Sequence, residues 1–100
     1  MENRADYEAW ADLLKALAHP LRLQIMHSLL RDGCHNVSCI ERRTGVSQSS
    51  ISQHLQKLRA AGLVVSERSG NEVYYRPAAR PAVEWLMAVL MDEEVERHDP

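Results

Sequence analysis

Side chains that can hydrogen-bond to a base edge are concentrated over residues 47–54, where the sequence reads SQSSISQH. Gln can pair with adenine through its amide, and Ser can bond to bases or to phosphates. Lys and Arg residues follow, and their cations can reach phosphate oxygens. Ser is a poor residue inside a helix because its hydroxyl competes for the backbone, so a mere spacer would rarely contain so many. The expected DNA contacts in this segment are Ser47, Gln48, Ser49, Ser50, Ser52, Gln53, His54, Lys57 and Arg59.

A helix-turn-helix over residues 36–61 would position these side chains. A short helix is expected over residues 36–44, Gly45 breaks it, and the Ser47 hydroxyl can cap the helix that follows. In such a motif the second helix enters the major groove with its N-terminal end near the bases. The apolar stripe of this second helix recurs every three or four residues and consists of Ile51, Leu55 and Leu58.

A β-hairpin, or wing, is predicted over residues 63–76, where the hydrophobic period changes from about 3.6 to 2. Ser69, Gly70 and Asn71 have the composition of its turn. A hairpin beside a helix-turn-helix can lay polar and basic side chains along the DNA, although it could also serve only to stabilise the fold. Tyr74 and Tyr75 must point to opposite faces, and the sequence does not decide which of them packs on the core. The expected DNA contacts here are Arg68, Ser69, Asn71 and Arg76.

Three further helices complete a single domain over residues 1–100, which is mainly α with one β-hairpin. They are expected over residues 6–18 with Asp6 as N-cap, from Pro20 to Gly33, and over residues 81–97. The order α-α-α-α-β-β-α is that of a winged helix-turn-helix.

The first and last helices carry more apolar surface than a 100-residue monomer needs to cover itself. We therefore expect a homodimer through these two helices, whose two-fold symmetry would place two recognition helices about one DNA turn apart. The alternative is that they only close the monomer core. The expected interface residues are Trp10, Leu14, Leu17, Val83, Leu86 and Leu90.

A net charge of −2, taken alone, argues against a nucleic-acid partner. The charge is, however, unevenly distributed along the chain. Residues 1–40 carry a net charge of −1. Residues 41–80 contain seven basic and three acidic residues, a net charge of +4, whereas residues 81–100 contain one basic and six acidic residues, a net charge of −5. The basic segment therefore coincides with the helix-turn-helix and the hairpin.

Several classes of protein are disfavoured. No run of about 18 apolar residues could span a membrane, and the N-terminus lacks the pattern of a secretory signal, so the cytoplasm is the expected compartment. Glycine-rich phosphate loops, G-x-S-x-G and H-E-x-x-H are absent, so we expect neither an enzyme nor a cofactor. A winged helix that binds only protein is the alternative function, but it should show apolar residues in place of Ser49, Ser52 and Gln53.

Cys34 and Cys39 leave three interpretations open. With His35, and His27 one helix earlier, they offer ligands for zinc or softer ions, although their spacing lacks a tight C-x₂-C pair. Their Cα atoms could also come within bridging range, and a helix N-terminus could activate one thiol, which would make a redox switch. Two structural cysteines are the third interpretation.

The chain resembles the ArsR/SmtB family of winged-helix bacterial repressors. The resemblance is carried by LLKALAHPLRLQIMHSLL (13–30), GVSQSSISQHLQKLRAAGLV (45–64) and ERSGNEVYYRP (67–77), about 65 of the 100 residues. It implies a homodimer that binds a double-stranded DNA operator and blocks transcription. It further implies dimerisation through the first and last helices, and an inducer that lowers the affinity for DNA.

The chain departs from the metal-sensing patterns of this family. Asn36 and Ser38 occupy the positions of the family's Cys-x-Cys pair, and no Asp-x-His precedes a His-x-x-Glu/His in the last helix. The residues there are Glu84, Asp92, Glu96 and His98. We therefore expect no metal site, and a dimeric repressor released from its operator by thiol oxidation or a persulfide rather than by a metal, if it has an inducer at all.

Overall fold

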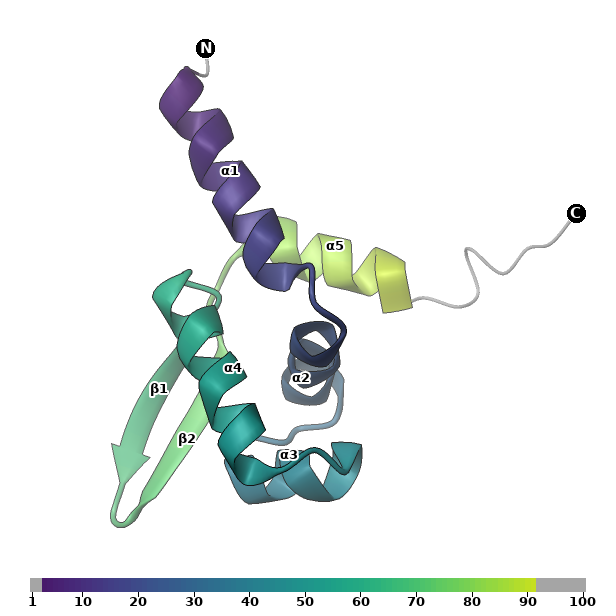
Figure 1. Ribbon diagram of the computed structural model, residues 1–100, viewed down its shortest axis with the longest axis vertical. Helices are drawn as coiled ribbons and strands as arrows, with labels where there is room; N and C mark the ends of the chain where they lie inside the picture. The colour runs from purple at the N-terminus through teal and green to yellow at the C-terminus, as the bar shows by residue number, and fades with distance from the viewer. Residues whose placement is uncertain (1–2, 92–100) are drawn as a thin grey trace, which may run out of the picture.

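The computed structural model describes residues 3–91 (Figure 1), and its order of elements is the predicted one. The part of the last predicted helix beyond residue 91 lies outside the described residues. The elements are α1 (Arg4–Leu17), α2 (Pro20–Arg31), α3 (Val37–Thr44), α4 (Gln48–Ala60), β1 (Val64–Ser69), β2 (Glu72–Pro77) and α5 (Pro81–Met91).

Side chains near the helix starts explain why the helices begin where they do. Asn3, and not Asp6, caps α1: its Oδ1 accepts from the Asp6 N–H at 3.2 Å, while Asp6 Oδ2 accepts from the Asn3 N–H at 3.1 Å. This is a reciprocal capping box, so the prediction that Asp6 is the N-cap is wrong by three residues. In α2, His19 is the N-cap and Pro20 occupies the first turn.

The turn between α3 and α4 is defined by two local signals that the sequence showed. The α3 helix ends at Gly45, whose φ of +74° lies in the left-handed region that favours glycine. Ser47 then caps α4, and its hydroxyl accepts from the Ser50 N–H at 3.3 Å. This turn places the exposed start of α4 beside α3.

In Figure 1 the α2 helix lies at the centre, with α1 and α5 above it, α3 below it, and α4 and the hairpin to its left. The core forms where α2 meets the inward sides of α1, α3, α4, α5 and the first strand. Its buried side chains are Leu17, Ile25, Met26, Leu29, Cys34, Ile40, Ile51, Leu55, Leu58, Leu63, Val64, Val83 and Met87.

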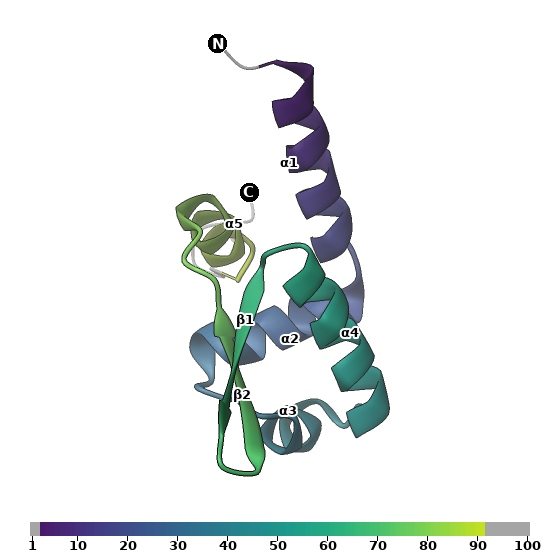
Figure 2. The ribbon, with the colours of Figure 1, turned by 90° about the vertical axis from the view of Figure 1, so that its left-hand side faces the viewer.

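The hairpin is antiparallel, with Glu67 opposite Tyr74 and Ser66 opposite Tyr75. Tyr75 packs against the core, whereas Tyr74 on the other face is 38% exposed. The Tyr75 N–H donates to the His35 carbonyl at 2.7 Å, which joins the hairpin to the loop between α2 and α3. In both views the tip lies at the same end of the molecule as α3, opposite α1 and α5 (Figures 1 and 2).

The end of the molecule formed by α1 and α5 exposes several large apolar side chains. Trp10 and Leu14 of α1 line one groove with Trp85 and Leu86 of α5, and Trp85 is 68% exposed. Leu90 is also exposed. Two residues expected on this surface, Leu17 and Val83, are instead 3% and 5% exposed in the protomer's own core.

No helix among residues 3–91 is long and apolar enough to cross a membrane.

The buried side of α4 provides a direct test of the fold. Replacement of Leu55, which is 0% exposed, by Ala should lower the free energy of unfolding by about 2–5 kcal/mol, because it leaves a cavity in a packed core. Gln56→Ala, on the exposed side of the same turn, is the matched control and should change it by about 0.5 kcal/mol or less. Urea unfolding measures both values, and equal losses would contradict this orientation of α4.

Candidate nucleic-acid interface

One side of α4 forms a polar surface that points away from the core. Ser49, Gln53, Gln56 and Lys57 are exposed on it, and Ser52 is half-buried at its edge. All but Ser49 border a single shallow hollow. We call these five residues the α4 face. A pattern of amides and hydroxyls with one cation beside it can bond to base edges and to a neighbouring phosphate.

Gln56 belongs to this face but is missing from the sequence-based set of contacts. It follows Gln53 by three residues and Ser52 by four, which is the spacing of neighbours on a helix surface. The spacing was therefore a usable signal. The serines at the N-terminal end of the helix are the more prominent signal in the sequence.

Four of the residues predicted to contact DNA in this segment lie outside the α4 face. Ser47 caps α4, and Ser50 is half-buried beside it. The Gln48 amide donates through Nε2 to Glu41 Oε1 at 2.7 Å, so it ties the start of α4 to α3. His54 is half-buried and bonded to α2, which places its ring outside the α4 face.

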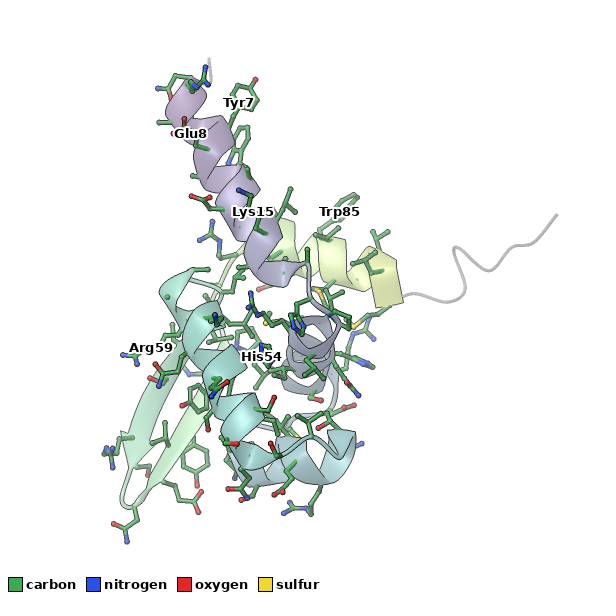
Figure 3. All side chains as sticks on the ribbon, viewed as in Figure 1. Tyr7, Glu8, Lys15, His54, Arg59 and Trp85 are labelled. Atoms are coloured by element: carbon green, nitrogen blue, oxygen red, sulfur yellow. A yellow bond between two sulfur atoms is a disulfide. The ribbon has the colours of Figure 1, made fainter. Side chains whose placement is uncertain are left out.

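His54 belongs to a small basic cluster between α4 and α2 (Figure 3). Its Nδ1 accepts a hydrogen bond from Arg22 Nε at 3.2 Å, and its ring centroid lies 4.5 Å from that of His19. Burial lowers the pKa of His54 from its ordinary value of 6.5, and the positive charges that His19, Arg22 and Lys57 can carry lower this pKa further. The neutral ring is the form that can accept at Nδ1.

The hairpin adds cations and hydrogen-bonding groups beside α4. Arg68, Ser69 and Asn71 are exposed at or near its tip. The Arg76 guanidinium lies 3.6 Å from Glu67 Oε1 across the two strands, so its charge is partly offset. Arg59 is exposed on α4 and extends on the side of the hairpin (Figure 3).

A second hollow connects the α4 face with the hairpin. Ser52 lines it together with Ser38 of α3 and Glu72 and Tyr75 of β2. The α4 face, the N-terminal part of α3 and the second strand are therefore parts of one continuous surface.

Cys34 and Cys39 are joined by a disulfide, and their Cα atoms are 5.5 Å apart. Cys34 follows α2 and is buried, whereas Cys39 is the third residue of α3 and is partly exposed. The Asn36 side chain accepts from the Cys39 N–H at 2.8 Å, so Cys39 lies in the first turn of a capped helix. Among the described residues, no three His, Cys, Asp or Glu side chains come together as a metal site would require.

Known proteins share this fold. The family profile described as bacterial regulatory protein, arsR family, matches residues 19–66. The chain is 38% identical over 91 residues to the nodulation protein NolR of Rhizobium meliloti, which covers 91% of this chain and 73% of NolR. The crystal structure of the transcriptional repressor PagR of Bacillus anthracis aligns with a TM-score of 0.77 and 36% identity, over 88% of this chain and 99% of PagR.

The solution structure of a Mycobacterium bovis protein aligns with a TM-score of 0.79 and 36% identity, over 100% of this chain and 95% of that chain. That structure is described as a homodimeric winged helix-turn-helix DNA-binding domain of a possible ArsR-family transcriptional regulator.

The lowered pKa of His54 predicts a pH dependence of stability. Because the unfolded chain binds the proton more readily, the free energy of unfolding should fall as the pH drops through 6.5, and it should stop falling below the folded-state pKa. His54→Asn has no proton to bind and should show a flatter pH profile between pH 8 and pH 5. Thermal melts of the two proteins across this range test the prediction, and profiles of equal slope would contradict it.

Proposed function

The chain belongs to the arsR family of bacterial regulatory proteins, and from this premise we propose that it represses transcription as a homodimer whose α4 face reads an operator. Members of this family are DNA-binding regulators and not enzymes. The observation that supports the proposal most strongly is the α4 face itself. We expect such a regulator to act in the cytoplasm, where the bacterial chromosome lies.

The composition of the α4 face suits double-stranded DNA better than a protein partner. Its exposed amides and hydroxyls match the donors and acceptors of the major groove, and the exposed Lys57 beside them can pair with a phosphate. The alternative function, a winged helix that binds only protein, would need an apolar centre on this helix. Within α4 every large apolar side chain is buried.

A second copy of the chain is the proposed partner of α1 and α5. The M. bovis relative is described as homodimeric, and here Trp10, Leu14, Trp85 and Leu90 leave an apolar surface open at the end opposite the hairpin tip. A two-fold axis through this surface would hold two α4 helices on one side of the dimer. Such dimers read half-sites about one helical turn of DNA apart.

Substitutions on the α4 face should separate base reading from phosphate contact. Gln53→Ala should weaken operator binding by about 1–3 kcal/mol and leave binding to random duplex nearly unchanged, because it removes hydrogen bonds to bases. Lys57→Ala should weaken binding to both duplexes about equally and flatten the salt dependence by about one phosphate contact. Fluorescence anisotropy at several salt concentrations measures these effects.

The chain supplies matched controls for both changes. Gln24→Ala on α2 and Lys15→Ala on α1 alter the same exposed side-chain types away from the α4 face, and neither should change the affinity (Figure 3 labels Lys15). The operator for these titrations is a duplex selected by the reduced wild-type protein from a randomised pool, and the titrations use reduced protein. If no duplex binds even at low salt, the proposed function is wrong.

We further propose that oxidation of Cys34 and Cys39 is the signal that releases the operator. Cys39 lies in the first turn of α3, where a helix N-terminus would favour a thiolate in the reduced protein, and the Cα atoms of the two cysteines are within bridging range. The two thiols give up two electrons and two protons to a hydroperoxide, which leaves as an alcohol and water. With a persulfide as oxidant, the products are a thiol and hydrogen sulfide.

The disulfide lies where a structural change could reach both the helix-turn-helix and the hairpin. It links the segment after α2 to α3, the first helix of the helix-turn-helix. Between the two cysteines, the His35 carbonyl accepts from the Tyr75 N–H, and the His35 ring lies 3.1 Å from the Tyr75 carbonyl oxygen. A change in the position of this segment would therefore reach β2 as well as α3.

Operator titrations of the reduced and the peroxide-treated protein test the thiol switch. The reduced protein should bind at least about tenfold more tightly than the oxidised one, a difference of about 1.4 kcal/mol. Cys34→Ser and Cys39→Ser should bind like the reduced protein under both conditions, and added zinc should change nothing. Equal affinities of the two wild-type forms would show that the disulfide is only structural.

A further inference from the structure

Two side-chain hydrogen bonds join α4 to other helices within residues 3–91. At its start, Gln48 bonds to Glu41 of α3, and at its middle, His54 bonds to Arg22 of α2. The first of these lies inside the helix-turn-helix. The second joins α4 to α2, which lies outside this motif. It can therefore couple the position of α4 to that of the rest of the protomer.

Arg22 holds two elements at once. Its Nε donates to His54 Nδ1 at 3.2 Å, and its Nη1 donates to the carbonyl of Ala16 at 3.0 Å. Ala16 lies in the last turn of α1, where carbonyls have no partner within the helix and carry the negative end of the helix dipole. One planar guanidinium therefore connects the C-terminal end of α1 with the middle of α4. Two such bonds from one rigid group fix direction as well as distance.

We propose that Arg22 is a positioning residue that sets the orientation of α4 relative to α1, with His54 as its receiving group. The inference rests on the proposed function, in which α1 lies at the dimer contact and α4 at the operator. Because the two α4 helices of a dimer must fit two half-sites together, a small rotation of α4 in each protomer would misplace both. Arg22 contributes to operator affinity through this geometry, without contact to DNA.

The link requires a neutral His54. Protonation puts a hydrogen on Nδ1, which then faces the Arg22 guanidinium as a second donor. The groups that lower the pKa of His54 are all basic: His19 at the N-cap of α2, Arg22 of α2, and Lys57 of α4 itself. Acidification therefore opens the link between α2 and α4 instead of strengthening it. This effect is opposite to the general one, in which an added positive charge raises the affinity for DNA.

Three single variants and one double variant test the link through the operator affinity of the reduced proteins at pH 7.5. Arg22→Met keeps the length of the side chain but cannot donate, and His54→Leu cannot accept; each should weaken binding about tenfold. The double variant should be no weaker than either single one. His54→Asn places an acceptor oxygen where Nδ1 lies, so it should restore binding to within about threefold of wild type. The probe is the duplex selected from the randomised pool, and thermal melts and sedimentation establish that each variant is a folded dimer.

The pH profile separates positioning from a general loss of structure. Between pH 7.5 and pH 5.5 the operator affinity of the wild type should fall relative to that of His54→Asn, and Arg22→Met should show no such fall. Additive losses in the double variant, or no rescue by His54→Asn, would overturn the inference. Wild-type protein that binds no duplex would refute the proposed function instead, so the two failures are distinguishable.

Discussion

Ile51, Leu55 and Leu58 are fully buried, so apolar packing decides which side of α4 faces the core. This orientation turns the α4 face outward and leaves His54 at the boundary with α2. Burying three such side chains stabilises the fold by about 1.5–3 kcal/mol each, far more than a surface hydrogen bond contributes. The polar surface is therefore a consequence of apolar packing, and its own residues are free to serve recognition.

The molecule separates its two interaction surfaces in space. The groove between α1 and α5 is apolar, and the opposite end carries the start of α4, α3 and the tip of the hairpin (Figures 1 and 2). Residues 41–80, which include α4 and the hairpin, carry a net charge of +4 although the whole chain carries −2. A second copy can therefore cover the groove while the polar residues of α4 stay open to DNA. Arg22 bonds to both α1 and α4, and the segment between the two cysteines bonds to β2, so each of them connects separate parts of the protomer.

Much of this fold could be predicted because its signals are local. Gly45 ends α3 and Ser47 caps α4 through contacts that involve only nearby residues, so the boundaries of the helix-turn-helix followed from residue type. Asn3 was missed as the cap of α1 because Asp6 is an equally good capping residue, and both take part in one capping box. The burial of Leu17 and Val83, the bond between His54 and Arg22 and the choice between Tyr74 and Tyr75 depend on contacts between distant segments. Periodicity gives the width of an apolar stripe, but it does not show which residue at its edge meets a neighbouring helix.

The most direct test of the account is an NMR titration of the ¹⁵N-labelled protein with the selected duplex. The account predicts that the backbone amides of Ser49, Gln53, Gln56 and Lys57 shift most, together with those near the tip of the hairpin, while Trp85 and its neighbours in α5 change little. Shifts confined to α1 and α5, with none on α4, would contradict the claim that this protein reads DNA with the polar side of α4.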